Sequence, residues 1–217
     1  MAVIQSAAST DIATVDDTMT ALRAAIKPDE LIGSYQLAAS SGATTLIAAN
    51  APVFSFRWAP GTGQLCVVKR VSVAWNCTTG FTAGQALGFA MFAARSFNAS
   101  DTVGTALTPI LGSSQKYRTA PFVSSMVTDA RISAAAALTA GTRTLDSQAL
   151  GSTQFYATAA TAGTLLTNTN LITYNANDHP LVLQNNEGFV ITNQVVMGAG
   201  GVGTLVVNVE WFETNYY

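Results

Sequence analysis

Long stretches of this chain carry no charged side chain, and this feature most constrains what the chain can fold into. Only 10% of its 217 residues are charged. The uncharged stretches are 32–56, 71–94, 147–177 and 188–209. Thr, Ser, Asn, Gln and Gly interrupt them, so the continuous apolar span of about 20 residues that a bilayer helix needs is missing. A free monomer needs a charged surface to stay dispersed. We therefore expect no membrane segment, and much surface buried against other protein subunits.

The charges that are present do not mark a nucleic-acid surface. Ten basic and twelve acidic residues give a formal net charge of −2. No basic cluster exceeds the pair Lys69-Arg70, so the electrostatic footprint of a nucleic-acid-binding protein is missing. The opening residues 1–5 have neither the basic nor the apolar region of a secretion signal. We expect synthesis in a cytoplasm and no nucleic-acid partner.

The two cysteines, Cys66 and Cys77, do not form a C-x-x-C metal or redox motif. If both lie in one strand, their odd spacing places them on opposite faces and prevents a mutual disulfide. We expect two buried free thiols, as in a reducing cytosol.

One helix is predicted, near the N-terminus, where apolar residues recur at spacings of four, three and four. This stripe consists of Val15, Met19, Leu22 and Ile26. A threonine can cap the start of the helix, and Pro28 ends it. So narrow a stripe suits a bundle with symmetry mates or docking on a partner, although it could also pack on its own domain. We take its four residues as candidate interaction residues, on an arm of residues 1–32 that precedes a body of residues 33–217.

The body has the alternating pattern of β-strands. Apolar and polar positions alternate most clearly in 67–75, 87–93, 189–197 and 205–211. Further strands are predicted at 42–49, 53–58, 130–137, 154–158 and 164–173. Many short strands, Gly-rich turns and no helix between them predict an all-β body, a β-sandwich of jelly-roll type. The segment 98–129 is predicted to be a long excursion, and excursions of that length usually make contacts.

A glycine motif in the last third resembles a nucleotide-binding fingerprint but lacks its context. Gly198, Gly200 and Gly203 match G-x-G-x-x-G. That motif must open a helix and be followed by an acidic residue about 20 positions later. The residues after Gly203 have strand periodicity instead, so we predict a hairpin turn and no cofactor.

The sequence gives little support for a catalytic site or a metal site. His179 is the only histidine and lies in a predicted turn, which excludes a multi-histidine metal site within one chain. Any Ser-His-Asp arrangement would have to include it. Paired-carboxylate chemistry could assemble only from distant residues such as Asp101, Asp129 and Asp146. The sequence predicts no catalytic, cofactor-binding or metal-ligating residue, and no enzyme.

The aromatic residues offer one remaining binding surface. Phe54, Phe56 and Trp58 alternate onto one face of their predicted strand. The inner face of a sandwich explains such a row. A carbohydrate platform is the alternative.

Several short phrases occur in an order that resembles a known family. They are Phe56-Arg57-Trp58-Ala59, Phe81-Thr82-Ala83-Gly84-Gln85, Ala94-Arg95-Ser96-Phe97, Asn98-Ala99-Ser100-Asp101-Thr102, Val127-Thr128-Asp129-Ala130-Arg131-Ile132, Ala137-Leu138-Thr139-Ala140-Gly141-Thr142, His179-Pro180-Leu181-Val182-Leu183, Asn186-Glu187-Gly188-Phe189-Val190-Ile191 and Val209-Glu210-Trp211. Over about residues 54–213 the chain resembles a family of virion structural proteins from tailed bacteriophages.

The resemblance implies a non-enzymatic component of the virion, made in the bacterial host cytoplasm and placed on the capsid surface. It implies a capsid decoration or cement protein whose partner is the major capsid protein or another virion subunit. By analogy with such proteins, a homotrimer is favoured. The alternatives are a tail, neck or head-fibre subunit and, from another class, a glycan-binding module.

Overall fold

The computed structural model describes residues 15–16, 21–22, 31–61, 63–107, 115–116, 124–125, 129–160, 162–163, 165–175 and 179–215. Within these ranges every regular element is a β-strand and none is a helix, which confirms the predicted all-β class. No helix that could span a bilayer occurs among them.

The strands of the body form two sheets, in which every pairing is antiparallel. The seven-stranded sheet contains, from edge to edge, β10 (Thr144–Leu145) with β11 (Gly151–Ala157), then β6 (Gln85–Arg95), β14 (Glu187–Asn193), β4 (Pro52–Trp58), β9 (Ala130–Ile132) and β7 (Thr105–Leu107). The six-stranded sheet contains β12 (Leu165–Thr173) with β13 (Leu181–Leu183), then β5 (Leu65–Thr79), β15 (Val202–Thr214), β3 (Leu31–Ser40) and β8 (Gln115–Lys116).

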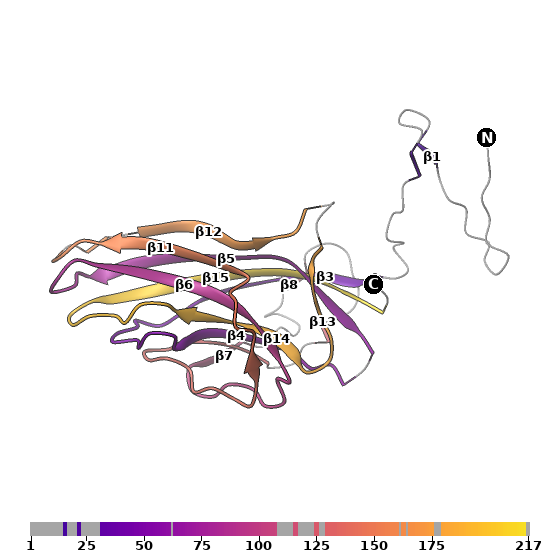
Figure 1. Cartoon of the computed structure of the whole chain (residues 1–217), viewed down its shortest axis with the longest axis horizontal. Helices are drawn as coiled ribbons and strands as arrows, with labels where there is room; N and C mark the ends of the chain where they lie inside the picture. Colours follow the sequence, from indigo (N-terminus) through magenta and orange to yellow (C-terminus); the bar gives the residue numbers. More distant parts are fainter. Residues whose placement is uncertain are drawn as a thin grey trace.

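The pairing is nested along the chain. β3 pairs with the last strand, β15, and β4 pairs with β14. β5 pairs with β12 and β13, and β6 pairs with β11. β3 and β5 belong to the six-stranded sheet, and β4 and β6 belong to the seven-stranded sheet. The partner strands follow later in the chain in the reverse order and alternate between the sheets in the same way. The result is two elongated layers that run side by side (Figure 1).

One hydrophobic core fills the space between the layers. Phe56 stacks on Phe189 within the seven-stranded sheet, with ring centroids 5.0 Å apart, and meets Trp211 of the six-stranded sheet edge-on at 5.3 Å. Trp75 and Phe89 join the sheets again at a centroid distance of 5.8 Å. Burial of large aromatic rings contributes several kcal/mol per residue, so these contacts hold the sheets together. The predicted inward row of Phe54, Phe56 and Trp58 is confirmed, because all three are fully buried.

The sequence places the first body strand wrongly. Residues 42–49 are predicted as a strand but contribute only an isolated bridge, between Thr44 and Gly203. The strand lies earlier, in β3, where Tyr35, Leu37 and Ala39 alternate inward with polar neighbours. The sequence of β3 contains many small and polar residues, so its alternation of apolar and polar positions was less evident than that of residues 42–49. The strand predicted at 130–137 ends at Ile132, because the chain then turns away.

The cysteines share one strand, but the predicted opposite faces are wrong. Cys66 and Cys77 both lie in β5, and both are buried in the same core. A register shift between Val68 and Arg70 leaves Lys69 as an extra residue, and such a bulge inverts the alternation beyond it. Both thiols are free. At about 3.3 Å per residue they lie roughly 35 Å apart along the strand, so they cannot bridge.

The N-terminal arm is described only in part. β1 (Val15–Asp16) pairs with β2 (Ala21–Leu22), so the backbones of four residues predicted as helix are extended. Met19, Ile26 and the rest of the predicted helix lie outside the described residues, and the helix stays a prediction. β3 begins at Leu31, two residues before the predicted start of the body.

Candidate functional site

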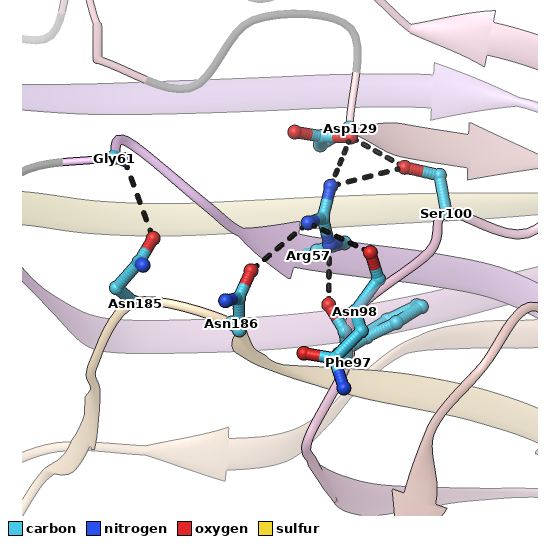
Figure 2. Close-up of polar contacts among 8 residues, drawn as sticks. All are labelled: Arg57, Gly61, Phe97, Asn98, Ser100, Asp129, Asn185 and Asn186. Atoms are coloured by element: carbon cyan, nitrogen blue, oxygen red, sulfur yellow. Dashed lines mark hydrogen bonds and ion pairs between the residues drawn. The ribbon is translucent and has the colours of Figure 1, made fainter.

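The most extensive polar site lies on the outer face of the seven-stranded sheet and centres on Arg57. Phe56 and Trp58 of β4 point into the core, so strand alternation sends Arg57 outward between them. Its side chain is only 16% exposed. Figure 2 shows its guanidinium surrounded by residues from loops that are far apart in the sequence.

The guanidinium of Arg57 has an acceptor for each of its five N–H donors. Nη1 donates to Asp129 Oδ1 at 3.1 Å and to Ser100 Oγ at 3.5 Å. Nη2 donates to Asn186 Oδ1 at 2.9 Å and to the Asn98 carbonyl at 3.3 Å. Nε donates to the Phe97 carbonyl. We call these six residues the Arg57 hub.

The loops of the hub are also tied together through their backbones. The amide of Arg57 donates to the Asp129 carbonyl at 3.0 Å, and the amide of Phe97 donates to the Asn186 carbonyl at 2.7 Å. Asn186 has a positive φ of 63°, a conformation that asparagine tolerates better than most residues. It therefore supplies both the turn before β14 and a side-chain acceptor for Arg57.

A second arginine fastens the neighbouring loops. Arg143 forms an ion pair with Asp101, and their side chains are 5% and 0% exposed. The guanidinium carbon of Arg143 lies 5.1 Å from the ring centroid of Phe97, in a cation–π arrangement. Burial lowers the pKa of Arg143 to about 10, so the group stays charged at neutral pH. The other Asp101 contact is with the amide of Gly141, which donates to Oδ1 at 2.8 Å.

A third polar cluster surrounds Glu213, whose side chain is fully buried at one end of β15. Its Oε1 accepts from Ser124 Oγ at 2.6 Å and from Trp211 Nε1 at 3.2 Å. Its Oε2 accepts from the amide of Ser125 at 3.0 Å. Burial raises the pKa of Glu213, although these hydrogen bonds oppose the shift. The carboxylate anchors part of the 98–129 excursion to the sheet.

These arrangements position loops rather than assemble a reactive centre. The three carboxylates considered from the sequence for paired-acid chemistry are not brought together. Asp129 pairs with Arg57, Asp101 with Arg143 and Asp146 with Arg95. In the described ranges, no group of three or more His, Cys, Asp or Glu side chains is placed to hold a metal ion.

The other residues considered from the sequence are also dispersed. His179 is exposed, in the connection that leads into β13. Gly198 and Gly200 lie between β14 and β15, as the predicted turn requires, whereas Gly203 is already part of β15. Of the four candidate interaction residues, Val15 and Leu22 are Cα partners in the β1–β2 pair, while Met19 and Ile26 fall outside the described ranges.

The sequence did not reveal the Arg57 hub, because its residues lie up to 129 positions apart. One signal was available: a lone arginine between two large aromatics in a strand must find partners on the outer face. Five of the phrases that carry the family resemblance supply hub residues, namely those containing Arg57, Phe97, Ser100, Asp129 and Asn186.

Comparison of the chain with protein-family models, curated proteins and solved structures finds no match.

Proposed function

We propose that this chain is a non-enzymatic structural protein of a tailed-bacteriophage virion, a capsid decoration or cement protein that stabilises the head. The observation that carries the proposal is that many charged side chains of the body pair with one another within the chain. Four arginines pair with five carboxylates of the same chain, and the pairs Arg57–Asp129 and Arg143–Asp101 are largely buried. The surface around these pairs is rich in Thr, Ser, Asn, Gln and Ala, which suits permanent contact with other subunits better than exposure to water.

The outer face of the six-stranded sheet supports this proposal. Along β15 the outward residues Thr204, Val206 and Asn208 are only half-buried, and on β3 Ala38 and Ser40 are exposed. The face carries the ion pair between Arg70 and Glu210, and the neighbouring outward positions are small or uncharged. A broad sheet face with so little charge fits a subunit interface, because desolvating its uncharged part costs little.

The strand order supports the architecture that the proposal requires. β3 pairs with β15, β4 with β14, β5 with β12 and β13, and β6 with β11, and the pairs alternate between the two sheets. This nested order supports the proposal of a jelly-roll sandwich. Jelly rolls are frequent in viral capsid proteins. The fold alone does not define function, so it adds weight only beside the surface composition and the phrases of the family resemblance.

In this proposal the partner is the major capsid protein, and a homotrimer covers a junction between capsomers on the capsid surface. Each bound copy would favour the intact expanded head over its dissociated parts, by mass action. The arm of residues 1–32, with Val15, Met19, Leu22 and Ile26, and the 98–129 excursion are the proposed contact elements.

The test is cosedimentation of the purified protein with expanded phage heads stripped of auxiliary proteins, counting bound copies per head. We expect saturable binding at a copy number that corresponds to one type of icosahedral axis. A double Met19→Asp, Leu22→Asp variant should lose trimerisation or head binding, whereas Gln184→Asp, at an exposed position outside both contact elements, should bind normally.

Failure to bind would change the assignment in a defined way. If the protein forms a stable ring or trimer but does not bind stripped heads, it is assigned as a tail, neck or head-fibre subunit. Such a subunit is present in far fewer copies per particle. Binding to a glycan array would favour the glycan-binding alternative, although Phe54, Phe56 and Trp58 are buried and could not form its platform.

A further inference from the structure

β11 is an unprotected sheet edge. Proteins usually guard edge strands by making them short, bulged or charged, because a free edge can pair with another chain. Most edges here are short: β7 and β13 have three residues each, and β8 and β10 have two. β12 is longer but has two register shifts against β5. β11 has seven residues in unbroken register with β6. Among the described residues, β6 is the only strand with which β11 forms a ladder.

The side chains of β11 also lack the usual guards. No charged residue occurs between 147 and 177. The outward residues Ser152, Gln154 and Tyr156 are all exposed, and Tyr156 is 63% exposed. On the inner side, Phe155 is only partly buried against the core.

The edge collects exposed apolar side chains as well. Among the described residues, six large hydrophobic side chains are exposed; Tyr156 lies in β11, and Leu150 directly precedes the strand. Exposed apolar side chains beside a free edge favour a contact surface there.

We propose that β11 pairs antiparallel with β11 of a second copy of this chain, joining two seven-stranded sheets across a two-fold axis. The register that uses all seven residues centres on Gln154. It sets Tyr156 opposite Ser152 of the partner subunit and Phe155 opposite Thr153 of the partner subunit. Aromatic side chains opposite small or β-branched ones are favourable cross-strand pairs, so the strand complements itself.

The absence of charge argues for a second copy over another partner. An acidic or basic segment would find no opposite charge between residues 147 and 177 to pair with. An identical strand brings the same uncharged surface and places like side chains opposite each other only at Gln154, where two amides can hydrogen-bond. Two-fold contacts of one patch with itself are also the commonest closed association.

The inference does not depend on the virion role. The contact uses a strand edge of the seven-stranded sheet, not the arm or the outer face of the six-stranded sheet. It joins two copies, or two trimers if the proposed trimer also forms.

Cysteine cross-linking of the full chain tests both the contact and its register. Residues directly opposite in an antiparallel pair have Cβ atoms about 5 Å apart, close enough for a disulfide after small adjustment. Gln154→Cys should give a disulfide-linked dimer on mild oxidation with copper phenanthroline, reversed by reductant. Ser152→Cys alone should not, whereas a mixture of Ser152→Cys and Tyr156→Cys should. The native thiols of Cys66 and Cys77 are buried, so the wild type should not cross-link and serves as the negative control.

A second variant tests the contact without cross-linking. Gln154→Lys places two ammonium groups opposite each other, and the exposed site should tolerate it with an unchanged melting temperature. Light scattering should then give half the mass of the wild type. The proposal is overturned if Gln154→Cys does not cross-link, if Ser152→Cys cross-links equally fast, or if Gln154→Lys leaves the mass unchanged.

Discussion

The outer faces of the two sheets differ in what covers them. On the seven-stranded sheet the outward residues Ala90, Ala94 and Val190 are at most 1% exposed. Ala94 and Val190 pack with Phe97, which contacts both Arg57 and Arg143. On the six-stranded sheet the corresponding positions, such as Val206 and Asn208 of β15, stay half-buried and carry little charge.

The difference shows that the most buried ion pairs of this protein lie on the covered face, although Arg70 on the open face and Arg95 are 43% and 61% exposed. Arg57 and Arg143 lie where solvent is largely excluded and hold loops down, while the open sheet face is left almost neutral. In an ordinary soluble domain the charges would cover the open face instead. The predictions below test this division, from the largest expected effect to the smallest.

Among variants that remove a charge, Arg143→Met should cause the largest loss of stability. It leaves Asp101 buried without its cation, and breaking a buried pair in this way costs about 4 kcal/mol. Urea unfolding followed by tryptophan fluorescence measures the change. The double variant Arg143→Met, Asp101→Asn should recover a large part of it, because no unpaired charge remains. If the single and double variants are equally unstable, the ion pair does not fasten these loops.

Arg57→Ala should destabilise the same face by about 3 kcal/mol, since five acceptors lose their donor and one is a carboxylate. Arg57→Lys is the matched control. It keeps the charge but cannot present five N–H groups in a planar fork, so it should recover only part of the loss. Full recovery with lysine would mean that charge alone, not the geometry of the hub, holds the loops. Hydrogen exchange of residues 97–100 and 185–186 should report the local loosening.

Glu213→Gln extends the comparison to a charge that faces the interior. The pKa of Glu213 is raised in the folded protein above its ordinary value of 4.5. Its contribution to stability is therefore fully present below that ordinary value and is lost as the pH rises through the folded pKa. Wild type should become less stable relative to Glu213→Gln as the pH increases through the raised pKa of Glu213. Unfolding curves across the acidic range measure this, and a constant difference would contradict it.

Val206→Lys should have the smallest effect. The side chain lies on the open face, and such surface changes usually stay within about 0.5 kcal/mol. Ala90→Lys is its counterpart on the covered face and should prevent normal folding, because the new ammonium has no space or partner. Thermal melting of both variants decides the point. Equal tolerance would show that the two faces do not differ as described.

The sequence predicts most long strands because burial on one face forces an alternation of period two. That pattern identified β4, β5, β6, β14 and β15 closely. It failed where the chain departs from simple alternation. β3 has few large apolar residues, and the extra residue Lys69 in β5 inverts the faces on which Cys66 and Cys77 were expected.

The polar sites could not be predicted in the same way. Arg57, Asp129 and Asn186 carry no shared spacing, because the nested pairing of distant strands brings them together. Glu213 follows the alternation of β15 into the interior, where a carboxylate is not expected, and its partners lie in a loop without periodicity. A pattern along the chain reports local geometry, whereas these contacts depend on the strand order.

The position of β15 also affects how the protein is made. This strand lies at the centre of the six-stranded sheet, between β5 and β3, and it is synthesised after every other strand of the two sheets. Before β15 is made, β5 and β3 lack the strand that joins them, so we expect the body to fold only after β15 has been synthesised, and slowly, as non-local pairing requires. Ribosome-bound chains that stop before Val202 should remain sensitive to protease. Products that end before β15 would then lack a folded body, and only chains that include this strand could compete for places in an assembly.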